Sequence, residues 1–309
     1  MLETVLIEGF IYGIMVLGVF VSYRTLNFCD MTVDGAFPMG GCILAACLLN
    51  GVPPSVALLI AFVGGCLAGL CTTMLYTKLR IPDLLAGILM MTMLYSVNLR
   101  IMNNRANVSF LRIQTIFSKI TAFFTERFPS LPSEVGILLF LIVFIILLKS
   151  LLDLFFHTDL GLTMGALGAN EQMIVSQGVN PQIVRGIGIC FGDGLAALAG
   201  AFAAMYNGFA DVGSGTGVIV SGLASLMLGE VKHRVADIGV ELSFDDSVVE
   251  LVAKEGFDPV YGARPLRRAI VRMVEDTFSA EMLEGRISKG DKIVAKADGE
   301  KVVFEKTAE

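Results

Sequence analysis

The stretch Ser221–Arg234, SGLASLMLGEVKHR, decides how this chain is organised, because two composition rules meet inside it. Up to Gly229 its residues are apolar or small, and from Glu230 onward charged residues become frequent. The sequence before this stretch is typical of a membrane protein, and the sequence after it is typical of a soluble one. We therefore predict two domains, residues 1–230 and residues 231–309.

Charge is distributed unevenly between the two parts. Residues 1–230 contain 10 Lys and Arg and 13 Asp and Glu, whereas residues 231–309 contain the remaining 13 and 16. The whole chain of 309 residues is 55% hydrophobic, with a mean hydropathy of +0.74, which indicates several membrane spans. The predicted fold class is a multi-span all-α membrane bundle followed by a small soluble α+β domain.

The same composition argues against several kinds of site. Both parts are net acidic, and the dense basic cluster is limited to one short stretch, so no nucleic-acid partner is expected. The six cysteines lie in or beside apolar segments, with no CxxC and no histidine at ligand spacing. We interpret them as helix-packing residues and predict no metal site, no cofactor and no catalytic residue.

Five apolar runs are long enough to cross about 30 Å of hydrocarbon. They lie at about 3–22, 55–77, 84–102, 135–156 and 184–206. A sixth run, 35–51, is short and contains Pro38 and several glycines, so we expect a helix that is interrupted or begins within protein surroundings. Asp30, Thr32 and Asp34 then lie at its mouth, where they either cap the helix or line a substrate path.

Small residues recur at every fourth position of the last long run. On a helix they form one stripe that lets a neighbouring backbone approach closely, which is how helices associate in lipid. The stripe consists of Gly192, Ala196, Gly200, Ala204 and Gly208, and residues 64–72 and 9–13 repeat the pattern. Asp193 lies beside the stripe and either has a function within the membrane or reaches interfacial water.

Two connectors separate the long runs. Residues 103–133 place Phe110, Ile113, Phe117, Ile120 and Phe124 at helical spacing, which predicts an amphipathic helix at the membrane interface. Residues 157–186 are too polar to cross a membrane, and glycines and asparagines bound a short helix there, at about 170–177.

Four motifs of the first part, taken in order, resemble those of a known protein family. They are YRTLNFCDMTVDGAFPMGG (23–41), IPDLLAGILMMTMLYSVNLRIM (81–102), GALGANEQMIVSQGVN (165–180) and the striped helix. In this order they resemble the permease subunits of bacterial ATP-binding-cassette importers of the branched-chain and aromatic amino-acid uptake type. The resemblance covers roughly residues 1–230.

The resemblance implies a function and a set of site residues. Residues 165–180 correspond to the coupling helix that contacts the ATPase subunit, and the corresponding positions here are Gly165, Gly168, Asn170, Glu171, Gln172, Gly178 and Asn180. The polar residues within spans that could line the translocation path are Asp34, Tyr95, Asn98 and Asp193. Since the chain contains no GxxxxGK[ST] motif, ATP hydrolysis is expected in a partner.

The resemblance also implies partners and a location. These are a cytoplasmic ATPase subunit, an extracytoplasmic solute-binding protein, a second permease copy in a homodimer, and the lipid of a bacterial plasma membrane. A cytoplasmic coupling loop places Arg24, Lys78 and Arg80 inside, as the positive-inside rule favours. It leaves Arg105, Arg112, Lys119 and Arg127 outside, so local charge counting favours the opposite orientation. We follow the resemblance, because these outside charges belong to an amphipathic helix that can bind lipid headgroups directly.

The second part has the pattern of a compact α+β module. ELSF (241–244) predicts a strand, DDSVVELVAKEG (245–256) an amphipathic helix, and residues 265–285 a longer helix closed by Gly285. IVAKADGEKVVFEK (293–306) predicts a hairpin with Asp298-Gly299 in the turn.

GFDPVYGARPLRRAI (256–270) resembles the small C-terminal subdomain of the second ATPase ring in Clp-type protein-unfolding chaperones. That resemblance makes Arg264 the counterpart of the arginine that senses the γ-phosphate of ATP. Without the large subdomain that holds the nucleotide, Arg264 is alternatively a solvent-facing or ion-paired helix residue.

Three interpretations of the whole chain remain open at this point. It is a permease with an appended Clp-like domain in the cytoplasm, a membrane-tethered fragment of a chaperone, or a chimera of two incomplete modules. Val218–Gly229 spans only about 18 Å as a helix, too short to cross a bilayer unless the following charged residues extend it. We therefore expect the permease part to be C-terminally truncated and its transport to be impaired.

Overall fold

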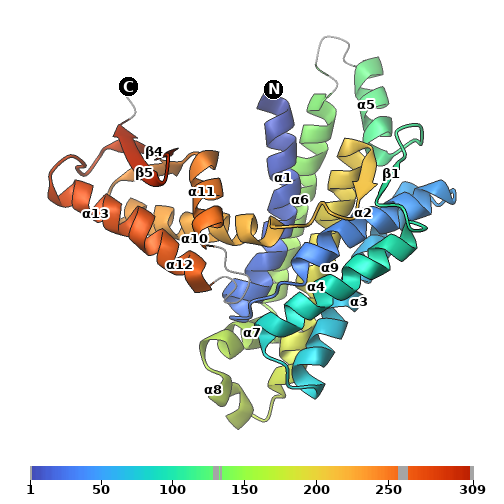
Figure 1. Ribbon diagram of the computed structural model, residues 1–309, viewed down its shortest axis with the longest axis horizontal. Helices are drawn as coiled ribbons and strands as arrows, with labels where there is room; N and C mark the ends of the chain where they lie inside the picture. Colours follow the sequence, from blue (N-terminus) through green and yellow to red (C-terminus); the bar gives the residue numbers. More distant parts are fainter. Residues whose placement is uncertain (1, 128–131, 133, 257–263, 307–309) are drawn as a thin grey trace. The chain divides into compact units, whose positions relative to one another are not determined.

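The computed structural model describes residues 2–127, 132, 134–256 and 264–306 (Figure 1). The chain divides into two compact units, Met1–Thr216 and Gly217–Glu309. The predicted domain boundary after residue 230 falls inside a helix of the second unit, α10 (Val218–Asp237), and stays a prediction. The two units are described separately below.

The first unit is a bundle of helices with one two-stranded sheet. Its elements before the long connector are α1 (Leu2–Val19), the π-helical continuation η1 (Phe20–Thr25), α2 (Val33–Leu49), α3 (Pro54–Lys78) and α4 (Asp83–Ile101). The rest are β1 (Asn107–Ser109), α5 (Ile116–Arg127), α6 (Glu134–Phe156), α7 (Asp159–Ala169), α8 (Glu171–Ser176), α9 (Pro181–Asn207) and β2 (Phe209–Asp211). In Figure 1, α5 lies at one end of this unit and α7 and α8 lie at the other.

Five helices are long and apolar enough to cross a membrane, as the sequence predicts. They are Glu3–Thr25, Pro54–Lys78, Asp83–Ile101, Glu134–Phe156 and Pro181–Asn207. The sixth apolar run forms the shorter helix α2, which continues through Pro38 and is buried from Val33 to Ala45. Burial among protein neighbours explains why this helix tolerates a proline and several glycines, since its freed backbone groups do not face lipid.

Helix α9 lies at the centre of the bundle, in contact with α1, α2 and α3. The contacts are close because glycines meet backbone atoms directly. A Cβ added to Gly40 of α2 would lie 1.7 Å from the Ala197 carbonyl oxygen, and one added to Gly200 would lie 1.8 Å from the Phe37 carbonyl oxygen. Neither position can hold a side chain without separating the two helices.

The predicted small-residue pattern at residues 9–13 does not pack in this way. A Cβ added to Gly9 or Gly13 would meet no atom within 4 Å among the described residues. By contrast, Gly18, one turn further along α1, lies against the Gly192 carbonyl oxygen. Spacing alone identified small residues on α1 but did not identify which of them faces α9.

The long connector differs from the predicted single helix. Residues 107–109 form β1, which pairs antiparallel with β2, and Phe110 donates its backbone N–H to the Gly208 carbonyl at 3.0 Å. Helix α5 begins only at Ile116, where the Thr115 hydroxyl accepts a hydrogen bond from the Ser118 N–H. Phe117 is buried, and its ring stacks on that of Phe202 of α9, so this part of the connector packs on the bundle.

The second unit combines α10 with a small α+β module. Its other elements are β3 (Glu241–Phe244), α11 (Asp246–Gly256), α12 (Arg264–Ile270), the π-helical η2 (Val271–Glu275), α13 (Asp276–Leu283), β4 (Lys292–Asp298) and β5 (Lys301–Lys306). The sheet has the order β3-β4-β5, with β3 parallel and β5 antiparallel to β4. The predicted strand, helices and hairpin are confirmed, although the pairing of Asp298 with Lys301 makes Gly299 and Glu300 the two turn residues.

Helix α10 contains the whole apolar run Val218–Gly229 and continues beyond it. The helix does not stop at Gly229 but extends through VKHRVAD to Asp237. Within the second unit α10 contacts α11, β3 and α12, and Arg234 forms an ion pair with Glu275. The charged residues after Gly229 therefore do extend the helix, which is one of the possibilities that the sequence leaves open. Helix α10 is nevertheless not among the five described helices that are apolar enough to span a membrane.

Candidate coupling loop and intramembrane polar residues

Three asparagine and threonine caps define the polar segment between α6 and α9. The Thr158 hydroxyl caps α7, the Asn170 side chain accepts from the N–H groups of Gln172 and Met173 at the start of α8, and Asn180 accepts from Gln182 at the start of α9. These bonds satisfy backbone donors that a helix start leaves unpaired. Two of the predicted coupling-loop residues, Asn170 and Asn180, thus have a structural role in fixing where α8 and α9 begin.

The glycines of this segment have different roles. Gly168 lies in α7 against the Thr25 carbonyl oxygen, only 2.1 Å from where a Cβ would be, so it permits α7 to pack on the end of η1. Gly178 has φ +78° in the turn between α8 and α9, a conformation that favours glycine. A Cβ on Gly165 would meet nothing within 4 Å among the described residues.

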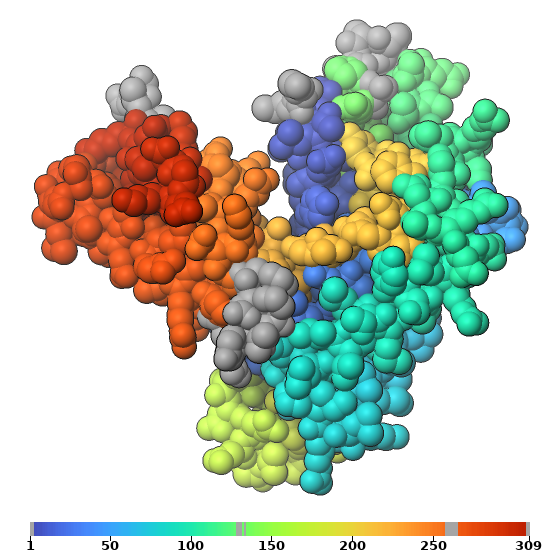
Figure 2. Space-filling model, viewed as in Figure 1, coloured from blue at the N-terminus to red at the C-terminus, as the bar shows by residue number. Residues whose placement is uncertain are grey.

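Helix α8 is exposed except for one residue. Ile174 is 2% exposed and packs in an apolar cluster with residues of the η1–α2 link, α7 and α9, namely Leu26, Phe28, Met164, Leu167, Val184 and Ile189. Glu171, Gln172, Met173 and Val175 are exposed around it. Figure 2 shows the yellow-green segment that contains α7 and α8 projecting from the surface of its unit.

Arg185 links α8 to two membrane-spanning helices, through an ion pair and a hydrogen bond. Glu171 Oε2 lies 3.1 Å from Arg185 Nη2 of α9, and Arg185 Nη1 donates to the Tyr76 hydroxyl of α3 at 3.0 Å. The Arg185 guanidinium also lies 5.3 Å from the centroid of the Tyr76 ring. The arginine side chain is only 11% exposed, so the link from α8 to α9 and α3 is partly shielded from solvent.

Arg185, Tyr76 and Ile174 were not predicted from the sequence. Ile174 stands between two other apolar residues, Met173 and Val175, so the sequence of α8 alone does not show which of the three is buried. The contact between Arg185 and Tyr76 joins residues 109 positions apart, and no local pattern reports it.

The predicted path residues are only partly brought together. Asn98 of α4 is fully buried and donates to the Gly35 carbonyl at 3.2 Å, next to Asp34 in the first turn of α2. Tyr95, one turn earlier on α4, is 52% exposed. Asp193 lies on α9, in the middle of that 27-residue helix, and its backbone carbonyl faces Gly65 of α3.

Asp193 is fully buried, which excludes the interpretation that it reaches interfacial water from the end of its helix. Among the described residues neither of its carboxylate oxygens has a hydrogen-bond partner. Asp30 is close enough to interact with it electrostatically, and its Oδ2 is also unpartnered within the described chain. Asp30 Oδ1 accepts the Thr32 N–H, while the Thr32 and Thr72 hydroxyls lie 2.8 Å apart, so Thr32 contacts α3 instead of capping α2 with its side chain.

The predicted packing stripe faces more than one neighbour. Gly192 lies against the Gly18 carbonyl of α1 and Gly200 against α2, while Ala196 and Ala204 are buried. Gly208 ends α9 in the left-handed conformation, with φ +75°. Small residues outside the stripe also pack closely, since a Cβ on Gly186 would lie 2.9 Å from Thr73 of α3.

The counterpart of the nucleotide-sensing arginine can be placed only in part. Arg264 is the first residue of α12, but its side chain, like residues 257–263 of the GFDPVYGAR motif, lies outside the described residues. Across the described parts of the chain, no group of three or more His, Cys, Asp or Glu side chains is arranged to hold a metal ion.

Comparison with known proteins identifies both parts of the chain. Residues 1–239 match a family model described as branched-chain amino acid transport system / permease component, and residues 219–295 match the C-terminal, D2-small domain of ClpB protein. The two matches overlap over residues 219–239, which include nearly all of α10. Both family models therefore recognise the same helix at the seam.

The curated relatives agree with this division. The tyrosine transport system permease protein of Clostridioides difficile (strain R20291) is 40% identical over 226 residues, which cover 73% of this chain and 72% of the relative. The chloroplastic chaperone protein ClpC4 of Oryza sativa subsp. japonica is 49% identical over 79 residues, which cover 26% of this chain but only 9% of the chaperone. The chain, a multi-pass membrane protein with a Clp-like C-terminal domain, belongs to the family of branched-chain amino acid transport system permease components.

Proposed function

We propose that this chain is the transmembrane permease subunit of an ATP-binding-cassette importer for a small amino-acid-like solute. The observation that carries the proposal is the construction of α8, a short helix that is exposed on all sides except at Ile174 and is tied to α9 and α3 through Arg185. The tyrosine transport permease relative favours an aromatic amino acid as the solute.

In this proposal a cytoplasmic ATPase subunit docks on residues 165–180. The exposed side chains of Asn170, Glu171 and Gln172 border a shallow hollow on α8, together with Val175. Movement of the ATPase would displace α8, and the Glu171–Arg185–Tyr76 contacts would transmit that displacement to α9 and α3. A rigid link is needed for this purpose because a loosely attached helix would move without moving the spans.

The remaining parts of the proposal follow from the family. A solute-binding protein delivers the solute outside a bacterial plasma membrane, and a second permease copy completes the translocation path. Asp34, Tyr95, Asn98 and Asp193 remain the proposed path residues of each copy, with Tyr95 exposed and the other three buried. In this proposal the Clp-like domain lies in the cytoplasm and Arg264 does not sense nucleotide.

Uptake by intact cells tests the proposal. In a strain that lacks the gene, the restored chain should return uptake of at least one labelled amino acid from a panel that includes tyrosine. Arg185→Gln should reduce that uptake at least tenfold while the amount of folded protein in the membrane stays the same, because it removes the charge that pairs with Glu171.

Arg127→Gln is the matched control, since Arg127 is exposed at the end of α5, outside residues 165–180, and its loss should leave uptake unchanged. Uptake that is unaffected by gene loss for every amino acid would refute the importer assignment. Capture of a chaperone subunit instead of a transporter ATPase, in a gentle-detergent purification, would refute the docking assignment for residues 165–180.

A further inference from the structure

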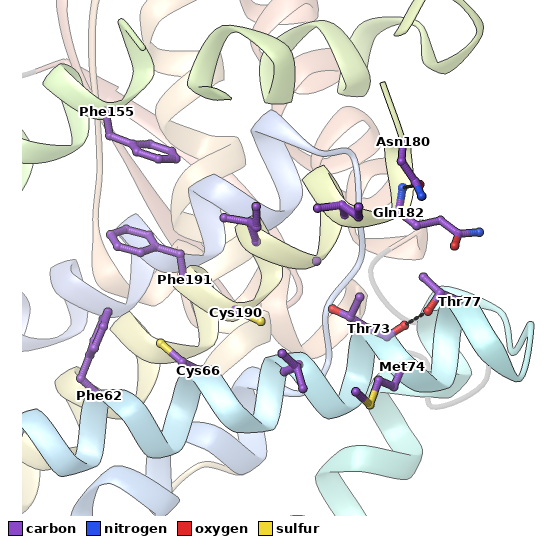
Figure 3. A pocket seen from close by; sticks show the side chains of 14 residues that line it. Phe62, Cys66, Thr73, Met74, Thr77, Phe155, Asn180, Gln182, Cys190 and Phe191 are labelled. Carbon is purple, nitrogen blue, oxygen red and sulfur yellow. Dashed lines mark hydrogen bonds between the residues drawn. The ribbon is translucent and has the colours of Figure 1, made fainter. Parts of the chain in front are cut away.

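A groove of about 560 Å³ runs along the contact between α3 and α9. Figure 3 shows the two helices side by side, with lining residues of α3 on one wall and those of α9 on the other. Ile183, Met74, Leu70 and Ile187 of its walls are 61%, 45%, 42% and 39% exposed. Because α3 and α9 are both membrane-spanning, these exposed apolar walls face lipid hydrocarbon.

The groove has one aromatic end and one polar end. At the aromatic end the Phe191 ring contacts those of Phe62 and Phe155, each at a centroid distance of 6.0 Å. At the other end lie the Thr77 side chain, Asn180 and Gln182, close to the start of α9 (Figure 3). The polarity of the groove therefore changes along its length in the same direction as that of a phospholipid, from acyl chain to headgroup.

The length of the groove also fits one lipid. From Phe62 to Thr77 the α3 wall rises through 15 residues, which is roughly 22 Å at 1.5 Å per residue. One leaflet is about 15 Å of hydrocarbon and roughly 20–22 Å with its headgroup region, so a lipid whose acyl chain fills the aromatic end has its headgroup at the polar end.

Two cations follow the polar end directly. Lys78 closes α3 and Arg80 comes two residues later, and both are exposed. In the described residues neither forms an ion pair. Basic side chains at the membrane interface beside a groove between spanning helices are the arrangement that binds anionic lipid headgroups.

We propose that this groove, named here the α3–α9 groove, binds an anionic phospholipid. One acyl chain lies between α3 and α9 toward Phe62 and Phe191, and the phosphate lies near Lys78 and Arg80. A second copy of the chain is a poorer occupant, because an apolar helix face would fill the groove but leave Lys78 and Arg80 without the anionic group that a headgroup supplies. The proposal goes beyond the importer function and requires only that α3 and α9 span the membrane.

Native mass spectrometry of the full chain tests it with two probes, phosphatidylglycerol and phosphatidylcholine. The wild type should retain phosphatidylglycerol at collision energies that strip phosphatidylcholine. The double variant Lys78→Gln, Arg80→Gln should bind phosphatidylglycerol about thirtyfold more weakly, since each cation near the surface contributes about 1 kcal/mol.

Variants of the apolar part distinguish lipid bound in the groove from lipid that contacts the protein surface nonspecifically. Ile187→Trp fills the groove and should abolish retention, whereas Ile146→Trp, on the exposed face of α6, should not. Equal retention of both lipids, or equal loss in both tryptophan variants, would overturn the proposal. So would disulfide cross-linking of Met74→Cys between two copies in lipid, because it would make the α3–α9 groove a subunit interface.

Discussion

The units Met1–Thr216 and Gly217–Glu309 are held together in different ways. In the first, helices meet through glycine and alanine at backbone distance, and large apolar side chains of α3 and α6 are left exposed. In the second, a small apolar core is surrounded by exposed ion pairs such as Arg286–Glu281, Lys292–Glu241 and Lys306–Asp291.

The two kinds of packing differ because the first unit is surrounded by lipid and the second by water. In lipid an exposed leucine costs nothing, so helices gain by close backbone contact. In water the same leucine must be buried, and the surface is left to charges.

The largest expected effect comes from the close contacts of the first unit. Gly200→Ala places a Cβ 1.8 Å from the Phe37 carbonyl oxygen, and should destabilise the bundle by about 3 kcal/mol, the upper end of the usual cost of overpacking. Gly13→Ala adds the same atom where nothing lies within 4 Å among the described residues. Thermal unfolding in detergent, followed by size-exclusion chromatography, should show a large loss for the first variant and none for the second.

The next-largest loss of stability is expected at α8. This helix belongs to the first unit but, like the surface of the second, it is exposed to water. Ile174→Ala should release α8 from its cluster at a cost of about 2–4 kcal/mol, because this is its one buried side chain. Hydrogen exchange of residues 171–176 should become faster while α9 stays protected. Val175→Ala, at a 53% exposed position, is the control, and equal exchange in the two variants would contradict the docking described here.

A smaller effect is expected from the surface of the second unit. Arg286→Met removes contacts with Glu281 and Glu284, but all three side chains are at least 25% exposed, so the free energy of unfolding should change by no more than about 1 kcal/mol. Chemical denaturation of the full chain, followed through the exchange of β4 and β5 amides, measures it. A loss of several kcal/mol would mean that this ion pair is part of the core.

The smallest effect is a dependence on pH. Hydrogen bonds from the Ser247 hydroxyl and N–H lower the pKa of Asp245, and those from Lys306 and the Ser288 N–H lower the pKa of Asp291. A carboxyl with a lowered folded-state pKa stabilises the fold above its ordinary value of 3.8 and loses that contribution as the pH falls through the lowered value.

Carbon-13 NMR titration of the full chain should therefore place both midpoints below the ordinary value. Ser247→Ala should move the Asp245 midpoint up without moving that of Asp291. A common shift of both midpoints would show that general surface charge, and not the named hydrogen bonds, sets them.

Composition and periodicity predicted much of this fold, and the reasons are local. The five spans, the strand at 241–244 and the hairpin follow from hydropathy over a window or from alternation along a strand, which neighbouring residues determine by themselves. Asn170 caps α8 where the sequence placed the start of the short helix, and Asn180 caps the next helix, α9; both are local, because a capping side chain acts within three residues.

The rest depended on contacts between distant segments. Helical spacing placed Phe110 and Phe117 on one predicted helix. In the structure residues 107–109 pair with β2 and α5 begins only at Ile116, so Phe110 lies outside the helix. Small residues marked α1 and α9 as packing helices without showing that Gly18, and not Gly13, meets α9. The Arg185–Tyr76 contact and the α3–α9 groove depend on two helices whose side-by-side position no local pattern encodes.

If the first unit is built for lipid and the second for water, two exposed leucines should differ in their access to water. Leu147 on α6 is 61% exposed and Leu283 on α13 is 88% exposed. In lipid nanodiscs, Leu283→Cys should react with a water-soluble maleimide within minutes, whereas Leu147→Cys should react only after the lipid is removed. Equal labelling of the two in intact nanodiscs, counted by mass above the native cysteines, would contradict the account.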